Sequence, residues 1–450
     1  MPARELAVAL LALAACGDNL PGPPATVEVV QVASISLTAN PQLDLLVVMD
    51  DTIGLDAVQF ELLNYVGEFL GRLASATGEL PGLHLGLTTS DMGSTGSSAP
   101  DAPAPGIGSV GNGGCAGRGR DGALRISSNA ADGSFLIDEP SAGGRITNYQ
   151  GDLATAFSTM LNAGGGGCGF EQHLRAMERA LINPVNAGFL RRDVGLAILV
   201  VADEDDCSVR NPRVFDPAAV ELGPFQSFRC TTGGLKCNEP VAATGFKTGC
   251  EPDEDSPTIR GVQPVLEFLD ALRPRQDLVI AGIIGDPSPV LVELRTPPGG
   301  GNALLTLGNV CGMQAISGGV NAGVRLASAI DHFEAHGTRS SICGGTLRGQ
   351  FLEAARAFKQ LLGVACIDAT LLADASPDED TQPNCEAYVV RDGERELVPM
   401  CPADGPCVEL ARDVSACPEG LDYLRATLRG ADPGPGQLEL YCERSLPPPH

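Results

Sequence analysis

The chain has 450 residues, of which 43% are hydrophobic and 19% are charged, so it can bury a sizeable core and is not disordered as a whole. Its formal net charge is −26, from 56 acidic and 30 basic residues. A surface of that sign repels phosphate backbones, so we expect no nucleic-acid partner, whereas solubility and cation binding are favoured.

The first fifteen residues, MPARELAVALLALAA, read as a signal peptide. Their apolar run is shorter than the roughly 20 residues that a membrane-spanning helix needs, and one basic residue precedes it. The following Leu13-Ala14-Ala15-Cys16 resembles the lipobox of bacterial lipoproteins. This resemblance implies cleavage before Cys16 and lipidation of its thiol. We therefore expect a cell-envelope protein, lipid-anchored to a membrane that faces the periplasm or the cell surface.

The cysteines point to the same compartment. There are 15 of them, and setting Cys16 aside leaves an even number that could form disulfides in an oxidising environment. No CxxC pair exists and the histidines are scattered, so a zinc site is not indicated. We expect a bridge between Cys168 and Cys207 that braces neighbouring loops. The disulfide candidates are Cys168, Cys207, Cys230, Cys250, Cys311 and Cys343.

Residues 16–40 open with Gly and Pro and are expected to form a lipidated linker. The apolar run from Leu43 to Asp50 predicts a buried strand, and helical spacing predicts a helix from Asp56 to about Ala76, with Asp56 and Gln59 resembling a capping box. A second strand is expected from Leu83 to Thr89. Residues 92–150 are rich in Gly, Ser, Ala and Pro, which indicates a long loop with one hairpin.

Beyond residue 170 the sequence again predicts alternating helices and strands. A helix is expected from Glu171 to Leu181, and Val194 to Ala202 is the clearest buried strand. A cysteine-bearing insertion follows at about 207–260. Further elements are a helix at Pro264–Leu272, a strand at Leu278–Ile284, and helices at Leu326–Phe333 and Gln350–Leu362. From residue 366 to 450 cysteines and prolines predict a small disulfide-held C-terminal region.

Strands that alternate with helices predict an α/β fold: one doubly wound, mostly parallel sheet with helices on both faces. Three strands end in an acid, at Asp50, Asp91 and Asp203. Because the carboxyl ends of parallel strands meet at one edge, these acids should converge there. Carboxylates and hydroxyls are the ligands of hard cations such as Mg²⁺, so we expect a possible Mg²⁺ site.

Six segments carry a wider resemblance: MDDTIGLDAVQ, LHLGLTTSDMG, GCGFEQHLRAMERAL, LAILVVADEDDCS, LGPFQSFRC, and SSIC with its following helix. Together they resemble the von Willebrand factor type A domain lipoproteins found in myxobacteria and related proteobacteria. The resemblance covers residues 40–370 and implies a Rossmann-like type A domain at 41–365.

Carried over residue by residue, the resemblance assigns the adhesion-site metal to Asp50, Thr52 and Asp203. Gly54 stands where a second hydroxyl belongs, so the site is partly degenerate. Glu171 lies where the family has a threonine, and Asp51 and Asp205 are weaker candidates that would add charge.

The resemblance implies a non-enzymatic binding or adhesion module. In this reading a metal ion at the carboxyl edge of the sheet takes a carboxylate from an unknown partner protein. The alternative is a structural or assembly lipoprotein that works without metal. No nucleophile, base and acid occur together in a catalytic pattern, so we do not expect an enzyme. His84 and His173 are expected to be surface or packing residues, and His332 and His336 lack the Glu of a zinc-protease helix.

Overall fold

The computed structural model describes residues 27–38, 40–75, 77–94, 107, 114–126, 131–296, 300–311, 319–343, 346–373, 383–418, 422–430 and 434–445. The expected signal peptide, Cys16 and the first part of the expected linker lie outside these residues. In the part of the chain that is described, no helix is both long enough and apolar enough to cross a membrane.

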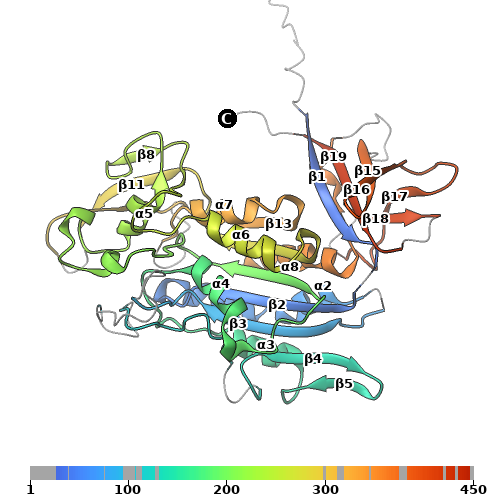
Figure 1. Cartoon of the computed structure of the whole chain (residues 1–450), viewed down its shortest axis with the longest axis horizontal. Coiled ribbons are helices and arrows are strands. Elements are labelled where there is room, and N and C mark those ends of the chain that lie inside the picture. The colour runs from blue at the N-terminus through green and yellow to red at the C-terminus, as the bar shows by residue number, and fades with distance from the viewer. Residues whose placement is uncertain are drawn as a thin grey trace, which may run out of the picture.

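A seven-stranded sheet lies at the centre of the molecule, in the order β13-β10-β6-β2-β3-β4-β5 (Figure 1). Its strands are β2 (Gln42–Met49), β3 (Gly82–Thr89), β4 (Leu136–Ser141), β5 (Gly144–Thr147), β6 (Gly195–Val201), β10 (Leu278–Ile284) and β13 (Gly337–Ser341). The first five in this order run parallel, and β4 and β5 form an antiparallel hairpin at one edge. Every residue of β3, β6 and β10 is buried, and β6 and β10 are accordingly continuous apolar runs.

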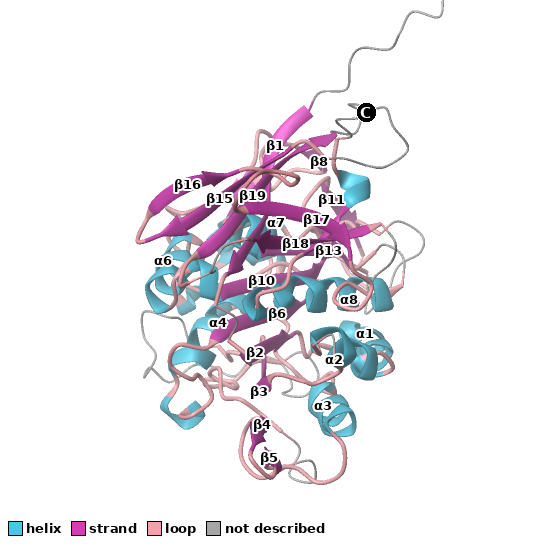
Figure 2. Ribbon diagram, turned by 90° about the vertical axis from the view of Figure 1, so that its right-hand side faces the viewer, coloured by secondary structure: helices cyan, strands magenta, loops and turns pink. Residues whose placement is uncertain are grey.

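Helices cover both faces of this sheet (Figure 2). One face packs against α1 (Asp56–Leu63), α2 (Val66–Leu73), α3 (Leu153–Leu161) and α8 (Leu347–Phe358), and the other against α4 (His173–Ile182), α6 (Gln263–Leu272) and α7 (Val324–Asp331). The predicted helix from Asp56 to Ala76 is divided between α1 and α2. Gln59 does not form a capping box: its side-chain amide donates to the main-chain oxygens of Asp50 and Gly164, both at 3.0 Å.

The predicted fold class, a single doubly wound and mostly parallel sheet, is wrong. The described strands divide among five sheets of seven, four, three, three and two strands, so the molecule is a mixed α/β assembly. Among the described strands, β2, β3, β6, β10 and β13 pair in parallel with one another, and the remaining strand pairs are antiparallel. Apolar patterning identifies strands, but it does not say which strands pair, because pairing depends on contacts far apart in sequence.

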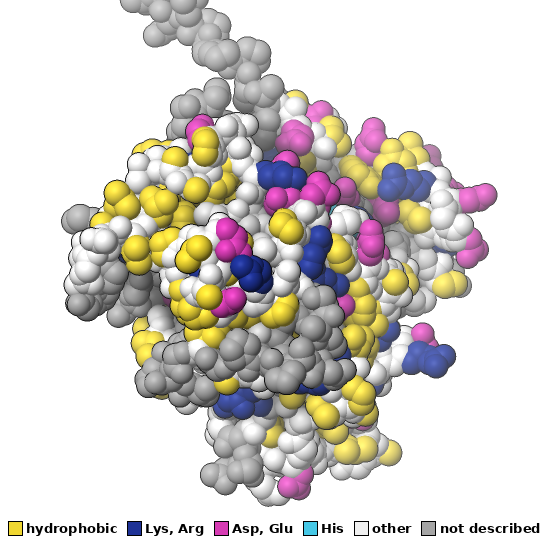
Figure 3. Space-filling model, turned by 60° about the vertical axis from the view of Figure 1, so that its left-hand side comes forward, with side chains coloured by type: hydrophobic (Ala, Val, Ile, Leu, Met, Phe, Trp, Pro, Cys, Tyr) yellow, Lys and Arg dark blue, Asp and Glu magenta, His cyan; other side chains and the backbone are white. Residues whose placement is uncertain are grey.

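The insertion after β6 forms one small sheet and adds a strand to another. It contributes α5 (Phe228–Gly234), β7 (Leu235–Lys236), β8 (Gly245–Lys247) and β9 (Glu251–Pro252), and β8 pairs with β11 (Val290–Arg295), which pairs with β12 (Leu304–Leu307). On the face drawn in Figure 3, basic side chains occur singly or in small groups among apolar and acidic ones.

The C-terminal region forms the other two sheets. They have the orders β1-β19-β15-β16 and β14-β18-β17, from β1 (Val27–Ser36), β14 (Cys366–Asp368), β15 (Cys385–Arg391), β16 (Glu394–Val398), β17 (Cys407–Arg412), β18 (Tyr423–Arg429) and β19 (Gln437–Ser445). Strand β1 was expected to be linker, yet it pairs with β19 along its length. Ala33 and Ile35 of β1 pack into the core between these sheets, so the start of the chain is part of the C-terminal unit.

Fourteen cysteines form seven disulfides, as the even count allowed. The pairs are Cys115–Cys168, Cys207–Cys230, Cys237–Cys250, Cys311–Cys343, Cys366–Cys417, Cys385–Cys442 and Cys401–Cys407. The predicted bridge between Cys168 and Cys207 is wrong. Both cysteines lie in one apolar cluster with Cys115 and Cys230, and each is bonded to one of these instead. Cysteine spacing cannot choose among neighbours that the fold brings to one place.

Candidate functional site

Asp50 lies directly after β2, at the carboxyl edge of the central sheet. Its main-chain nitrogen donates to Val201 of β6 at 3.0 Å, so the residue is fixed to the neighbouring strand. Its Oδ1 accepts the Thr52 main-chain N–H and the Thr52 hydroxyl, both at 2.8 Å. The side chain is fully buried, and its Oδ2 has no hydrogen-bond partner. One oxygen of the carboxylate is therefore held in place while the other is left uncompensated.

Asp203 approaches Asp50 from the end of β6. It is also buried, and its Oδ1 has no hydrogen-bond partner, while Asn321 fixes its main-chain oxygen at 2.8 Å. Burial and the charge of Asp203 raise the pKa of Asp50 to about 7. Burial and the charge of Glu204 raise the pKa of Asp203 to about 6, although a side-chain interaction with Asp50 opposes the shift. The convergence expected from two parallel strand ends is thus present, with repulsion between the two carboxylates.

The segment before α4 adds a third acid to this pair. Gln172 donates its main-chain N–H to Ser90 at 3.0 Å, and Cys207 donates to Glu171 at 2.7 Å, which fixes the segment across the ends of β3 and β6. Glu171 is buried, and its pKa is raised by burial, then by Glu204 and Asp50. A cavity of about 30 Å³, large enough for a water molecule, adjoins Glu171 and Glu204.

His173 and Glu204 belong to the site although sequence reasoning did not assign them to it. The His173 ring is fully buried, and its Nε2 lies 3.9 Å from Asp50 Oδ2. Burial lowers the pKa of His173, so the neutral form is favoured. Burial and then Asp50 raise the pKa of Glu204. The available signal was their position in EQH and DEDD, His173 two residues after Glu171 and Glu204 directly after Asp203.

Asp51 is part of a different acidic pair. Its carboxyl group is buried, and burial followed by the charge of Asp91 raises its pKa to about 7. Its main-chain oxygen accepts the N–H of Gly167 at 2.7 Å. A Cβ on Gly167 would lie 2.1 Å from Asp51 Oδ1, so this position in the glycine-rich run requires glycine. Asp51 and Asp91 therefore lie at the same edge of the sheet as Asp50 but act on each other as a separate pair.

Asp205 has a structural role instead of the weak ligand role predicted for it. Its Oδ1 accepts the main-chain N–H groups of Arg325 and Leu326 at 3.0 and 3.1 Å. Those groups open α7, so Asp205 caps this helix from a distant segment, where a negative charge is stabilising. The sequence could not show this, because the capped helix lies about 120 residues further along the chain.

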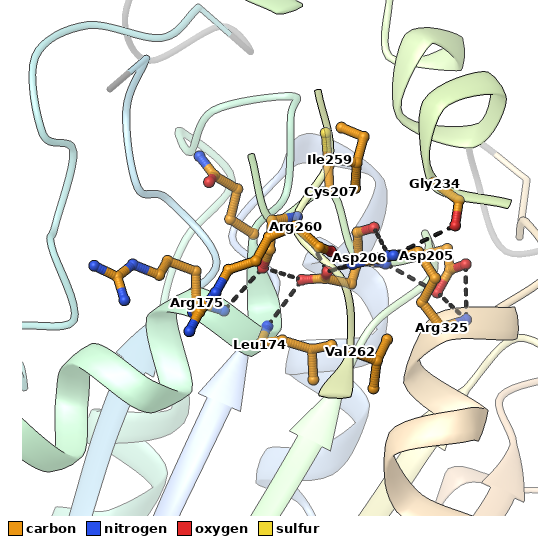
Figure 4. A network of polar contacts seen from close by, with 12 residues as sticks. Leu174, Arg175, Asp205, Asp206, Cys207, Gly234, Ile259, Arg260, Val262 and Arg325 are labelled. Atoms are coloured by element: carbon orange, nitrogen blue, oxygen red, sulfur yellow. Dashed lines mark hydrogen bonds and ion pairs between the residues drawn. The ribbon is translucent and has the colours of Figure 1, made fainter. Parts of the chain in front are cut away.

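Asp206 also has a structural role, because its carboxylate contacts Leu174 and Arg325 (Figure 4). Its Oδ1 accepts the N–H of Leu174 at 2.9 Å, and its Oδ2 lies 3.0 Å from the Arg325 guanidinium, in a fully buried ion pair. Arg325 also donates to the main-chain oxygens of Arg260 and Gly234 at 2.6 and 3.4 Å. The acidic run after β6 is thus divided: Asp203 and Glu204 face the site, and Asp205 and Asp206 fix the helices around it.

The other histidines lie elsewhere. His84 is buried at the opposite end of the sheet, with Nδ1 2.8 Å from the main-chain oxygen of Phe189. His332 lies just past the end of α7 and contacts Asp270 at 3.3 Å, while His336 is buried in a short 3₁₀ helix. Since α7 ends at Asp331, His332 and His336 do not share one helical face.

The donors at the strand edge fit a divalent cation in type, because two buried carboxylate oxygens lack any partner and repel each other. Among the residues that the structure describes, no three His, Cys, Asp or Glu side chains already stand in metal-binding geometry. Binding of an ion would therefore involve side-chain movement and retained water molecules.

Comparisons with known proteins give no family for the chain. No family model matches it, and no characterised protein matches it in sequence. Among solved structures, the pilus adhesin SpaC from Lactobacillus rhamnosus GG is similar with TM-scores of 0.31 and 0.32 and 8% identity over 90% of this chain. The adhesive tip pilin GBS104 from Group B Streptococcus agalactiae has a TM-score of 0.31 and 11% identity, covering 94% of this chain and 82% of its own. The chain spans 39% of the SpaC chain, and at these TM-scores the likenesses carry no argument about function.

Proposed function

We propose that this chain is a non-enzymatic binding module of the cell envelope, and that Asp50, Thr52 and Asp203 hold a divalent cation at its recognition surface. One observation carries the proposal: two buried carboxylates from neighbouring strand ends each have an oxygen without a partner. A fold that keeps such charges buried gains stability when a cation arrives, since the penalty for leaving them uncompensated is then removed.

The chain's own residues would orient the ligands. Thr52 fixes Oδ1 of Asp50 and leaves Oδ2 without a hydrogen-bond partner. Gln59 stabilises the same turn through the main-chain oxygens of Asp50 and Gly164. A bound ion would neutralise the carboxylates and offer an open coordination position, and a carboxylate on a partner protein is the group that completes such a shell.

The envelope location is supported by the covalent structure. Seven disulfides are stable in oxidising compartments and rare in the cytosol. The lipobox-like segment ending at Cys16 would add a membrane anchor. In this arrangement the lipid holds the chain at the membrane and the central sheet presents its acidic edge.

Titration calorimetry and thermal melting with Mg²⁺, Mn²⁺ and Zn²⁺ test the cation. We expect at least one ion to bind the wild-type chain and raise its Tm, and Asp50→Asn to abolish both effects. Glu396→Gln, which removes an acid from exposed β16, is the matched control and should bind as the wild type does. If no ion binds, or if Asp50→Asn binds unchanged, the cation proposal fails and a metal-independent structural role is favoured.

A further inference from the structure

His173 has no polar partner that explains its place in the structure. Its side chain is fully buried, yet neither Nδ1 nor Nε2 has a hydrogen bond. Buried imidazoles are normally hydrogen-bonded through at least one nitrogen, because an unpaired buried polar group costs free energy. Asp206, the second acid whose charge acts on the ring, is committed to Leu174, Ser208 and Arg325. The ring is therefore free to bind another group.

The distance between His173 and Asp50 suits a shared ion. Nε2 and Oδ2 lie 3.9 Å apart, and neither atom has a hydrogen-bond partner. Bonds from zinc to imidazole nitrogen and carboxylate oxygen are each about 2.0–2.2 Å, which puts two ligand atoms of a tetrahedral ion about 3.3–3.6 Å apart, so a small side-chain movement would bring both atoms onto one ion. The 3.9 Å separation is too long for a direct hydrogen bond between the two side chains.

The donor set also discriminates between ions. Mg²⁺ prefers oxygen ligands and keeps several waters, whereas imidazole suits borderline transition metals, which also accept carboxylates. A site with one neutral imidazole and one or two carboxylates therefore differs from the all-oxygen Mg²⁺ site that strand-end acids alone suggest.

We propose that His173 Nε2 and Asp50 Oδ2 bind one transition-metal ion together, so that this site selects Zn²⁺ or Mn²⁺ over Mg²⁺. The inference rests on the proposed function, since it concerns the cation held at the same strand edge. Asp203, with its unpartnered Oδ1, is the further carboxylate at the site. The role of His173 is to set which ion the recognition surface carries.

Calorimetry on the full disulfide-bonded chain, purified without a polyhistidine tag, tests the selectivity. For the wild type we expect Zn²⁺ to bind at least 100-fold more tightly than Mg²⁺. His173→Gln should weaken Zn²⁺ binding at least 10-fold and leave Mg²⁺ binding unchanged. His332→Gln removes a partly exposed histidine outside the site and should bind both ions as the wild type does.

Pulsed electron paramagnetic resonance of the Mn²⁺-loaded wild type gives a readout that needs no variant. We expect coupling from a ligating ¹⁴N nucleus, and its absence overturns the assignment of His173.

If Mg²⁺ and Zn²⁺ bind equally, if His173→Gln binds as the wild type does, and if Asp50→Asn removes binding, the His173 inference is wrong and the cation proposal stands. If none of the ions binds the wild type, the cation proposal itself fails.

Discussion

Strand β2 has a buried aspartate near each end, and the two have opposite surroundings. Asp44 accepts the main-chain N–H and the Nε of Arg191 at 2.7 and 2.8 Å, and Arg191 also contacts Glu139 at 2.8 Å. Asp50 faces the carboxylate of Asp203 and a neutral imidazole. Both aspartates are fully buried. The fold thus neutralises buried charge at one end of the sheet and leaves it uncompensated at the other, and the proposed cation site rests on this difference.

The pKa shifts express the same difference. Burial raises the pKa of both aspartates, but the charge of Arg191 and its hydrogen bonds oppose the shift at Asp44. At Asp50 the charge of Asp203 adds to the effect of burial. Desolvation is therefore common to the two ends, and the sign of the neighbouring charge is what separates a structural carboxylate from a candidate ligand.

Removing the positive charge of Arg191 from the neutralised end should have the largest effect on stability. Arg191→Met removes the guanidinium from buried Asp44, which keeps only the main-chain N–H of residue 191 as a hydrogen-bond donor, and removes donors to the main-chain oxygens of Leu43 and Gly82. We expect a loss of about 3–5 kcal/mol in the free energy of unfolding, measured by urea denaturation. Adding Asp44→Asn to this variant should recover part of the loss. Wild-type stability in Arg191→Met would show that the pair contributes nothing.

Removing the charge of Asp50 from the uncompensated end should raise the stability of the cation-free protein instead of lowering it. The pKa of Asp50 is about 7 in the folded chain and near its usual 3.8 when unfolded, so between pH 4 and 7 the folded state holds a proton that the unfolded state has lost. The cation-free protein therefore loses stability as pH rises through this window, and the loss is complete above pH 7.

Asp50→Asn should remove this contribution while keeping an oxygen for Thr52. At pH 8 we expect the cation-free variant to be more stable than the wild type by about 2–4 kcal/mol, and at pH 4 the difference should vanish. Urea denaturation in the presence of a chelator measures both. An equal difference at the two pH values would mean that Asp50 does not titrate in this range.

The smallest effect is expected where an acid only caps a helix. Asp205→Ala removes the acceptor for the first N–H groups of α7, and we expect a loss of about 1 kcal/mol with cation affinity unchanged. Denaturation and Zn²⁺ titration of the same preparation measure the two quantities. A fall in cation affinity comparable with that of Asp50→Asn would show that Asp205 contributes to cation binding.

Local sequence patterns predicted the central elements well. The strand expected at Leu278–Ile284 has those bounds in the structure, and the strand expected from Leu83 begins one residue earlier. These runs are recognisable because every residue in them is buried on one face or the other of the sheet. The hairpin expected within residues 92–150 is present as β4 and β5.

Long-range pairing was not predictable in the same way. Strand β1 was expected to be linker because Gly and Pro precede it, yet its partner β19 lies at the other end of the chain. Likewise Asp205, expected as a weaker ligand, is bound to α7, and His173, expected as a surface or packing residue, lies 3.9 Å from Asp50. Each outcome depends on a contact with a segment that local patterning does not identify.

The sequence by itself determined that this is an acidic chain with enough cysteines for seven disulfides, and that strands ending at Asp50 and Asp203 are buried. Composition, cysteine count and apolar runs are properties of the chain that do not depend on how it folds. Only the tertiary structure decided which cysteines pair, which acids are neutralised, and that an imidazole lies 3.9 Å from Asp50. Those outcomes depend on which distant side chains share one buried volume, because Arg325 neutralises the carboxylate beside it, whereas a carboxylate beside another carboxylate keeps its burial penalty.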